Sequence, residues 1–315
     1  MNLPLSIRIG TRDSKLALWQ AARVKERLEQ QGVACTLVPV KSEGDLDLVT
    51  PLYAMGVEGV FTKTLDAHLL SDRIDIAVHS MKDVPTQLAA GLVQAAVLER
   101  GNYKDILIAR NATAQQRLLN GEQYPAVIAT GSIRRKAQWL RRYPGHRIEN
   151  LRGNVQTRMQ KLQDNEWEGA IFAAAGLERM AMAIPYSIAL DWMLPAPAQG
   201  AIMVVCREQD DWVQTQCAML NDEATAACVK AERDFLSALM GGCSTPISAL
   251  AEWVDGQLCF KGNILSPDGN DYLEHSAVFS SADAGTAGIV AAEAIKERGA
   301  ASIVAAIKAH KQEQK

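Results

Sequence analysis

Residues 74–85, IDIAVHSMKDVP, place polar groups directly after an apolar run. The apolar part, residues 74–78, is typical of a strand buried on both faces of a parallel sheet. Asp83 follows a cationic Lys82, and Pro85 ends any further strand pairing. Open α/β sheets bind ligands beyond the carboxyl ends of their strands, where partial burial tunes the acidity of a carboxylate. An arbitrary Lys-Asp pair more often forms a turn whose Asp bonds its own backbone, so these residues alone leave both interpretations open.

One of the six cysteines has unusual surroundings, because Cys243 follows Gly241 and Gly242 and its thiol would be accessible on a flexible loop. Alone, the sequence GGC indicates little. The chain has five His and no CxxC pair, so no zinc or other metal site is predicted. The other cysteines are expected to be small buried hydrophobes with reduced thiols, namely Cys35, Cys206, Cys217, Cys228 and Cys259.

A third candidate feature is a local excess of positive charge. Residues 131–161 contain nine Lys or Arg against one acid, Glu149, although the whole chain has a net charge of −3. Several of these arginines follow predicted strands, where a guanidinium can grip a carboxylate or phosphate with two hydrogen bonds. A solvated helix face explains Arg141 and Arg142, but it explains poorly the arginines placed just beyond strands. The pattern favours a basic cleft.

These side chains require a scaffold of alternating strands and helices. The pattern predicts one α/β unit before residue 99, a second over residues 103–194, and a return to the first sheet at 201–206. Passages at 99–102 and 194–200 link the units, which favours a bilobed protein with a hinged cleft. From residue 222, a long helix over 223–239, a hairpin turning at Asp255-Gly256, a strand near 275–279 and a helix over 282–298 predict a small α+β domain. Residues 41–60 are expected to form a mobile loop that could cover the cleft.

Length and composition limit the class of protein. At 315 residues with 48% hydrophobic content, two or three globular domains are expected. The small net charge gives no general attraction to nucleic acid or anionic membrane. Because neither a leader nor a long apolar run is seen, we expect a cytoplasmic protein with no membrane partner.

Seven motifs, in order along nearly the whole chain, resemble the hydroxymethylbilane synthase family, also called porphobilinogen deaminases. They are IGTRDSKLALWQ, VHSMKDVPT, TGSIRRKAQ, LRGNVQTR, AAGLER, LPAPAQGA and AERDFL with GGCSTPI. The resemblance implies two α/β domains like those of periplasmic binding proteins around a cleft, plus a small C-terminal α+β domain. The implied boundaries are 1–99 with 199–218 for the domain with the catalytic acid, 103–194 for the arginine-rich domain, and 222–315 for the C-terminal domain.

The resemblance also implies roles for single residues. Asp83 matches the catalytic carboxylate, and Cys243 matches the cysteine that holds a dipyrromethane cofactor through a thioether. The other cofactor-binding positions implied are Arg134, Arg135, Ser132, Thr130, Lys82, Ser80 and Asp45. The substrate-binding positions implied are Arg12, Ser14, Arg152, Arg158, Arg179 and Gln199.

The implied reaction joins four porphobilinogen molecules to that primer with loss of ammonia, and water then releases hydroxymethylbilane. Porphobilinogen carries an acetate and a propionate, so six linked rings bring twelve carboxylates, which accounts for the arginine surplus. A monomer with this small-molecule substrate, and with no nucleic-acid partner, is implied.

Five positions depart from the family pattern: Glu58, Thr64, Gly131, Gln156 and Met240. Glu58 weakens a direct grip of the mobile loop on substrate, and Gly131 removes one possible donor to the primer. None affects Asp83 or Cys243, so activity is expected to survive.

Two other classes fit parts of the pattern. A bilobed small-molecule binding protein would use the same cleft, but would have no use for an open Cys243 with a heavy adduct. A nucleic-acid binder could use residues 131–161, but only Trp139 and Tyr143 are available there for stacking.

Overall fold

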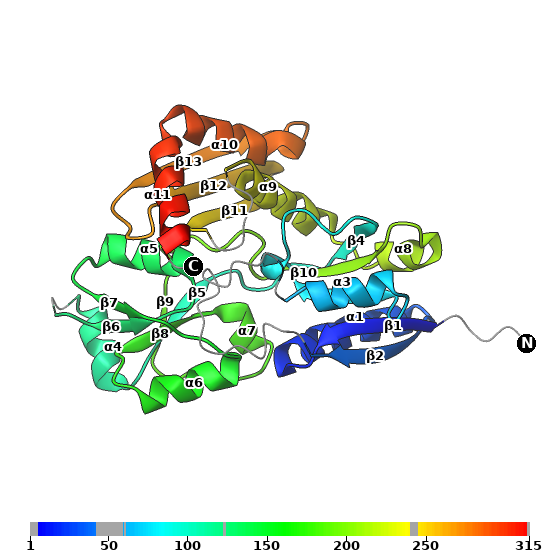
Figure 1. The fold of residues 1–315 in the computed structure, drawn as a ribbon, viewed down its shortest axis with the longest axis horizontal. Helices are drawn as coiled ribbons and strands as arrows, with labels where there is room; N and C mark the ends of the chain where they lie inside the picture. The colour runs from blue at the N-terminus through cyan, green and yellow to red at the C-terminus, as the bar shows by residue number, and fades with distance from the viewer. Residues whose placement is uncertain (1–5, 42–58, 60, 122–123, 240–244, 314–315) are drawn as a thin grey trace, which may run out of the picture.

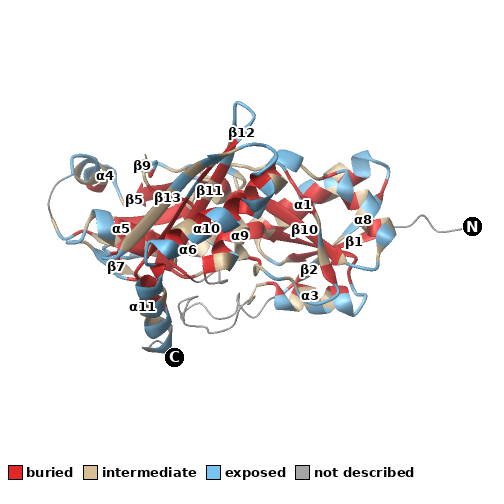
Figure 2. Cartoon of the chain, turned by 90° about the horizontal axis from the view of Figure 1, so that it is seen from above, coloured by how far each residue is buried: buried red, intermediate tan, exposed pale blue. Residues whose placement is uncertain are grey.

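The computed structural model describes residues 6–41, 59, 61–121, 124–239 and 245–313. Three sheets organise this part of the chain, two of five strands and one of three (Figure 1). Buried residues concentrate on the strands and on the helix faces that cover them (Figure 2). None of the described helices combines the length and apolar character needed to span a bilayer.

The first sheet has the strand order β2-β1-β3-β10-β4. Its central strand β3 pairs in parallel with β1 and antiparallel with β10, so the predicted parallel sheet is in fact mixed. Val78 packs in the core on the α1 side and Ala77 in the core on the α3 side, which confirms burial of both faces. The elements of this lobe are β1 Ser6–Arg12, α1 Lys15–Gln30, β2 Ala34–Val40, α3 Lys63–Leu70, β3 Ile76–Ser80, a 3-10 turn Met81–Asp83, β4 Leu92–Val97, β10 Ile202–Arg207 and α8 Asp211–Ala218.

The second sheet repeats this arrangement with the order β7-β6-β8-β5-β9. Three parallel strands again adjoin one antiparallel strand, here β5. β1 with α1 in the first sheet and β6 with α5 in the second are equivalent strand-turn-helix units. The elements are β5 Asp105–Ala109, α4 Ala112–Leu119, β6 Val127–Ala129, α5 Ile133–Arg142, β7 Arg147–Glu149, α6 Val155–Asp164, β8 Gly169–Ala173, α7 Ala174–Glu178 and β9 Ser187–Ala189.

Two crossover segments, residues 98–104 and 194–201, connect the lobes and touch each other. The Gly101 N–H donates to the Gly200 carbonyl at 3.1 Å. Gly200 has φ +90°, and a Cβ there would lie 2.6 Å from the Gly101 oxygen, so this approach requires glycine.

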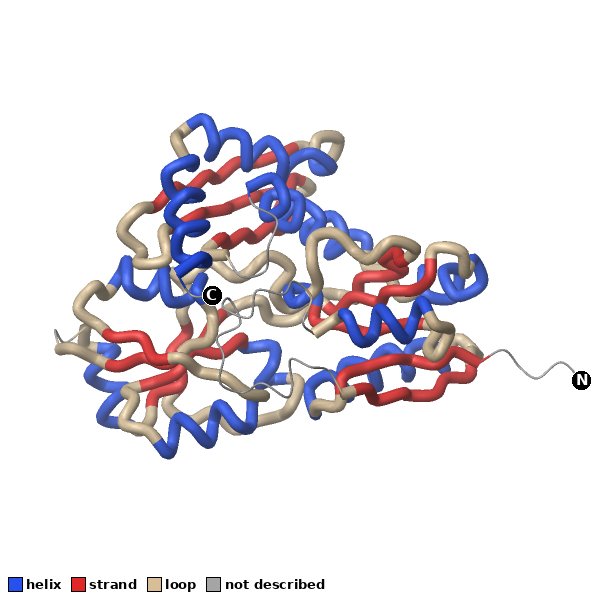
Figure 3. The backbone as a smooth tube through the Cα atoms, in the orientation of Figure 1, coloured by secondary structure: helices blue, strands red, loops and turns tan. Residues whose placement is uncertain are grey.

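The C-terminal part is an antiparallel sheet, β11-β12-β13, covered by helices on one face (Figure 3). The predicted hairpin is confirmed, with positive φ at Asp255 and Gly256 in its turn. α9 and α10 pack so closely that a Cβ on Gly288 would lie 1.9 Å from the Ala231 carbonyl oxygen. The elements are α9 Glu223–Leu239, β11 Ile247–Val254, β12 Gln257–Leu265, β13 Tyr272–Phe279, a 3-10 turn Ala284–Thr286, α10 Ala287–Glu297 and α11 Ala300–Glu313.

Glu232 of α9 connects the C-terminal part of the chain to both crossover segments through hydrogen bonds. Its fully buried carboxylate accepts hydrogen bonds from Arg100 Nη1 at 2.6 Å and Nη2 at 3.1 Å. It also accepts from the Ala198 N–H at 2.6 Å and the Ala251 N–H at 2.8 Å. One side chain thus connects three separate segments of the chain, one through the Arg100 guanidinium and two through backbone N–H groups.

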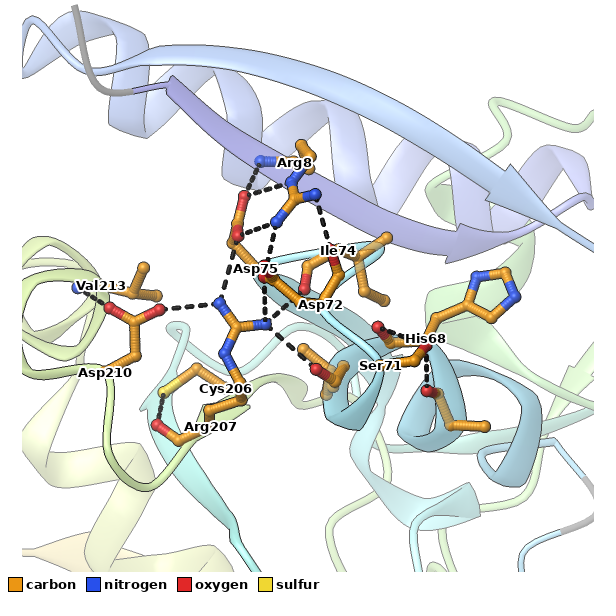
Figure 4. Close-up of polar contacts among 12 residues, drawn as sticks. Arg8, His68, Ser71, Asp72, Ile74, Asp75, Cys206, Arg207, Asp210 and Val213 are labelled. Carbon is orange, nitrogen blue, oxygen red and sulfur yellow. Dashed lines mark hydrogen bonds and ion pairs between the residues drawn. The ribbon is translucent and has the colours of Figure 1, made fainter.

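In the first sheet, a network of charged side chains connects β1, the residue before β3 and the end of β10 (Figure 4). Asp75 accepts from the Arg8 backbone N–H at 2.7 Å, Arg8 Nε at 2.9 Å, Arg8 Nη2 at 2.7 Å and Arg207 Nη2 at 3.2 Å. Burial raises the pKa of Asp75, but the hydrogen bonds from Arg8 and Arg207 outweigh it, so the net shift is downward. The Asp72 carboxylate bonds the same Arg8 but is 75% exposed.

Asp75→Asn should therefore lower the free energy of unfolding at pH 7 by about 2 kcal/mol. Because the folded pKa is depressed, this stabilisation is present above the unfolded pKa of about 3.9 and is lost as pH falls through the folded pKa. In urea denaturation at a series of pH values, the difference from the unmodified protein should narrow below about pH 4. Asp72→Asn is the matched control and should cost about 0–1 kcal/mol. An Asp75→Asn difference that is equally large at low pH would contradict this account.

Candidate active site

The candidate acid Asp83 lies at the end of β3, in the 3-10 turn Met81–Asp83. The strand continues through His79 and Ser80, two residues further than the apolar run suggested. The Met81 N–H donates to the Ala201 carbonyl, and Arg233 of α9 donates to the carbonyls of Val84 at 2.9 Å and Pro85 at 2.5 Å. The turn is therefore fixed from two sides. Asp83 is half-buried, and no donor among the described residues bonds its carboxylate, so its oxygens remain available to a ligand.

Unlike Asp83, the nearby Lys82 and Ser80 side chains both form hydrogen bonds with other parts of the protein. Lys82 Nζ donates to Gln199 Oε1 at 3.2 Å. Burial and then the charge of Arg135 lower the pKa of Lys82 to about 8, and Asp83 and Asp105 partly offset this. Ser80 Oγ is hydrogen-bonded to the amide of Gln20 on α1, with Gln20 Nε2 at 2.9 Å. Ser80 and Lys82 therefore face different sides of the turn.

Arg134 and Arg135 lie in the first turn of α5, which Ser132 begins by accepting the Arg135 N–H at 3.5 Å. Thr130 Oγ1 accepts the Ser132 N–H at 3.3 Å. Both arginines are almost fully buried. Their charges reach Lys82 of the first lobe, so residues from both lobes meet here.

The partner of both arginines is Asp105, a fully buried carboxylate at the start of β5. It accepts from Arg134 Nη2 at 2.6 Å, Arg135 Nε at 3.1 Å, Arg135 Nη2 at 2.8 Å and Gln199 Nε2 at 2.8 Å. Burial raises the pKa of Asp105, but the charges of Arg134 and Arg135 bring it down to about 2. No motif or spacing in the sequence predicted a role for Asp105. Asp105 is an acidic residue directly before the apolar residues 106–109, in a domain rich in cations. A buried acid there needs a cationic partner, and this pattern could have predicted its role.

Three further predicted arginines belong to the same group. Arg152 is buried in the turn after β7, and Arg158 on α6 donates through Nε to the Gly153 carbonyl at 2.8 Å. Burial, followed by the charges of Arg135 and Arg152, lowers the pKa of Arg158 to about 10, with smaller effects of Asp83 and Arg12. Arg12 ends β1, with its Cζ 4.1 Å from the centre of the Phe61 ring, and Ser14 caps α1. The charges of Arg12, Asp83 and Arg152 all act on Arg158, so these groups surround it.

Arg179 lies apart from this group. Its Nη2 donates to the Gly200 carbonyl at 2.5 Å, and its Cζ lies 5.7 Å from the centre of the Trp19 ring. It lines a cavity of about 310 Å³ together with Trp19, Arg23 and Arg27 of α1. The structure thus places this predicted substrate residue against the crossovers.

Two predicted site residues, Cys243 and Asp45, lie outside the described residues. The pKa values of four other cysteine thiols are raised, chiefly by burial: to about 11 for Cys35 and Cys206, and to about 12 for Cys217 and Cys228. These four are buried and unreactive, as expected, whereas Cys259 is half-buried. The described residues contain no group of three His, Cys, Asp or Glu that could hold a metal ion.

The structure describes the surroundings of three of the five positions that depart from the family pattern: Gly131, Gln156 and Thr64. A Cβ on Gly131 would lie 2.5 Å from the Leu151 carbonyl oxygen, so a hydroxyl residue does not fit there without a backbone shift. Gln156 Nε2 lies 3.6 Å from Met180 Sδ, and Thr64 lies in α3. Glu58 and Met240 lie outside the described residues.

Comparison with known proteins identifies the family. The model for "Porphobilinogen deaminase, dipyromethane cofactor binding domain" matches residues 7–215, and that for "Porphobilinogen deaminase, C-terminal domain" matches 226–297. A porphobilinogen deaminase of Syntrophotalea carbinolica is 40% identical over 96% of this chain and 96% of its own. A chloroplastic one of Oryza sativa is 43% identical over 86% of this chain and 77% of its own. Among solved structures, the methionine binding protein MetQ has a TM-score of 0.45 at 12% identity, over 69% of this chain and 90% of its own.

The group around Asp83 suits the cofactor that the family model names. Six cations, Arg12, Lys82, Arg134, Arg135, Arg152 and Arg158, lie with two carboxylates, Asp83 and Asp105, which leaves a surplus of four positive charges in this group. A dipyrromethane with an acetate and a propionate on each ring carries four carboxylates. In addition, Arg134 Nε is buried with no hydrogen-bond partner among the described residues, so it has a donor to offer.

Both parts of the chain match this family, relatives at about 40% identity extend over almost the full length, and the charge of the site fits the cofactor. The chain therefore belongs to the porphobilinogen deaminase (hydroxymethylbilane synthase) family, enzymes of tetrapyrrole synthesis with a dipyrromethane cofactor.

Proposed function

We propose that this protein is a transferase that condenses four porphobilinogen molecules, head to tail, onto a dipyrromethane held by Cys243. Water then releases the linear tetrapyrrole hydroxymethylbilane. The observation that supports this most strongly is the Asp83 carboxylate, which accepts no hydrogen bond from the described residues, beside a group of six cations and one further acid. We further propose that the enzyme acts as a monomer in the cytoplasm, as the resemblance implies.

Asp83 is the proposed catalytic acid and base. Asp83 first donates a proton to the amine nitrogen of porphobilinogen. The bond between that nitrogen and the aminomethyl carbon then breaks, ammonia leaves, and positive charge remains on the pyrrole ring. A carboxylate bonded to the pyrrole N–H stabilises that charge. The bound dipyrromethane supplies the nucleophilic carbon to which the new bond forms. Asp83 then accepts the proton that this carbon loses.

The cations neutralise carboxylates of the cofactor and substrate. We propose that Arg134, Arg135, Lys82, Ser132, Thr130, Ser80 and Asp45 surround the cofactor, and that Arg12, Ser14, Arg152, Arg158, Arg179 and Gln199 bind substrate. Lys82 and Arg158 support this, because burial lowers the pKa of both, and an anionic ligand would offset that cost. Of these roles, those of Arg179 and Gln199 have the least support. The Arg179 side chain bonds the crossover backbone, and the Gln199 amide is buried and already bonded to Asp105, Tyr103 and Lys82.

The proposed domains are residues 1–99 with 199–218, 103–194, and 222–315. The three sheets fall within these ranges, and the paired crossovers at Gly101 and Gly200 lie between the first two. Catalysis would thus occur where Asp83 of the first domain meets the arginines of the second.

The test is the stoichiometry of turnover. Purified protein incubated with porphobilinogen should release four ammonia molecules for each linear tetrapyrrole that appears. Binding of porphobilinogen without release of ammonia would overturn the proposal and favour a binding protein. Arg134, Arg135 and Arg152 are buried rather than presented on the surface, which argues against a nucleic-acid interface.

A further inference from the structure

Asp105 has more polar contacts than a structural ion pair requires. Three side chains from two segments donate to it: Arg134 and Arg135 from α5, and Gln199 from the second crossover. The carboxylate is completely inaccessible to solvent. A buried charge of this kind is retained only if it is fully paired, and here it is.

The two arginines depend on this carboxylate for their geometry. They are adjacent in sequence and almost fully buried, so their charges repel each other at close range. Each has one further bond to a backbone carbonyl: Arg134 Nη1 to Leu194 at 2.6 Å, and Arg135 Nη1 to Ile171 at 3.0 Å. Asp105 binds a further edge of each arginine, and Arg134 Nε, which has no hydrogen-bond partner among the described residues, can donate to a ligand.

Asp105 is also linked to the first lobe through one amide. Gln199 Nε2 donates to Asp105 Oδ1 at 2.8 Å, while Gln199 Oε1 accepts from Lys82 Nζ at 3.2 Å. Gln199 Nε2 also donates to the Tyr103 carbonyl at 2.7 Å. The ammonium group next to Asp83 and the guanidinium pair on α5 are therefore oriented by the same carboxylate.

We propose that Asp105 is a positioning residue of the cofactor site. It holds Arg134 and Arg135, and through Gln199 also Lys82, in the arrangement that receives the carboxylates of the dipyrromethane. This rests on the proposed function, because it assigns Asp105 a part in acquiring that cofactor.

The test compares how fast cofactor-free protein gains mass from porphobilinogen. An Asp105→Asn amide turns its NH₂ towards one of the arginines and removes the charge that pairs them, so their orientation is lost. The loading rate should fall at least about tenfold, equivalent to about 1.4 kcal/mol. The matched control is Glu232→Gln, since Glu232 is equally buried and also binds an arginine, Arg100. This control should lose stability but load within about twofold of the unmodified rate.

A second measurement separates positioning from a purely structural role. The charged groups that act on Lys82 are Arg134, Arg135, Asp83 and Asp105, with the neutral Gln199 in contact. Asp105 raises the pKa of Lys82, so neutralising it should lower that pKa below about 8. The alkaline decline of the loading rate should therefore move to lower pH in Asp105→Asn, and should not move in Glu232→Gln.

The outcomes are distinguishable. If the unmodified protein gains no mass, the proposed function fails. Suppose instead that the unmodified protein gains mass, that the loading rate of Asp105→Asn is within about twofold of its rate, and that the alkaline decline stays at the same pH. The positioning role is then overturned. Should Asp105→Asn not fold, Gln199→Met decides. This variant keeps the ion pairs of Asp105 with Arg134 and Arg135 but removes the hydrogen bonds of Gln199 to Asp105 and Lys82. The loading rate should fall several-fold, and an unchanged rate would overturn the proposal.

Discussion

Asp83→Asn should leave the fold intact and reduce the rate of tetrapyrrole formation by about a thousandfold or more. The side chain has no hydrogen-bond donor among the described residues, so the amide costs the folded protein little. Its chemical effect is large, because an amide neither accepts the proton from the attacking carbon nor balances the charge left when ammonia departs. Steady-state turnover and a urea denaturation curve, measured on the same preparation, check both parts.

The matched control for this variant is Asp211→Asn, an exposed carboxylate at the start of α8. It should change neither turnover nor stability measurably. A near-normal rate in Asp83→Asn would refute the role assigned to Asp83, whatever the control does.

Cys243→Ser should yield a protein that carries no stable cofactor and makes no tetrapyrrole. A serine oxygen is a far weaker nucleophile than a thiolate, so it does not replace the thioether. Intact-mass measurement should give the mass of the bare chain, and activity should fall to background.

The control here is Cys259→Ser on β12, the half-buried cysteine. It should retain both the added mass and the activity. If Cys243→Ser kept its activity, the attachment site would lie elsewhere.

Elements with local sequence signals were predictable. Helix α9 was predicted over residues 223–239 and spans those residues, and the Asp255-Gly256 turn correctly marked the β11–β12 hairpin. The antiparallel placement of β10 between β3 and β4 was not predicted, because it depends on pairing between segments more than a hundred residues apart. Helix α11 was also missed. Its buried Ile303 and Ile307 have helical spacing, but no helix was predicted beyond residue 298.

The site was predictable as far as the motifs extended. They grouped Asp83, Lys82 and the arginines that the structure brings together, but periodicity alone gave only a basic cleft. Asp105 was missed because its partners lie 29, 30 and 94 positions away and only folding places them around it. The position of Arg179 against the Gly200 carbonyl likewise depends on how the crossovers pack.

The most direct test of the account is the mass of freshly purified, active protein, followed by mapping of any adduct to a peptide. We predict an excess of two pyrrole units on the peptide that contains Cys243, and a ladder of further additions when porphobilinogen is supplied. Active protein with the bare mass of the chain, or an adduct on another peptide, would contradict it.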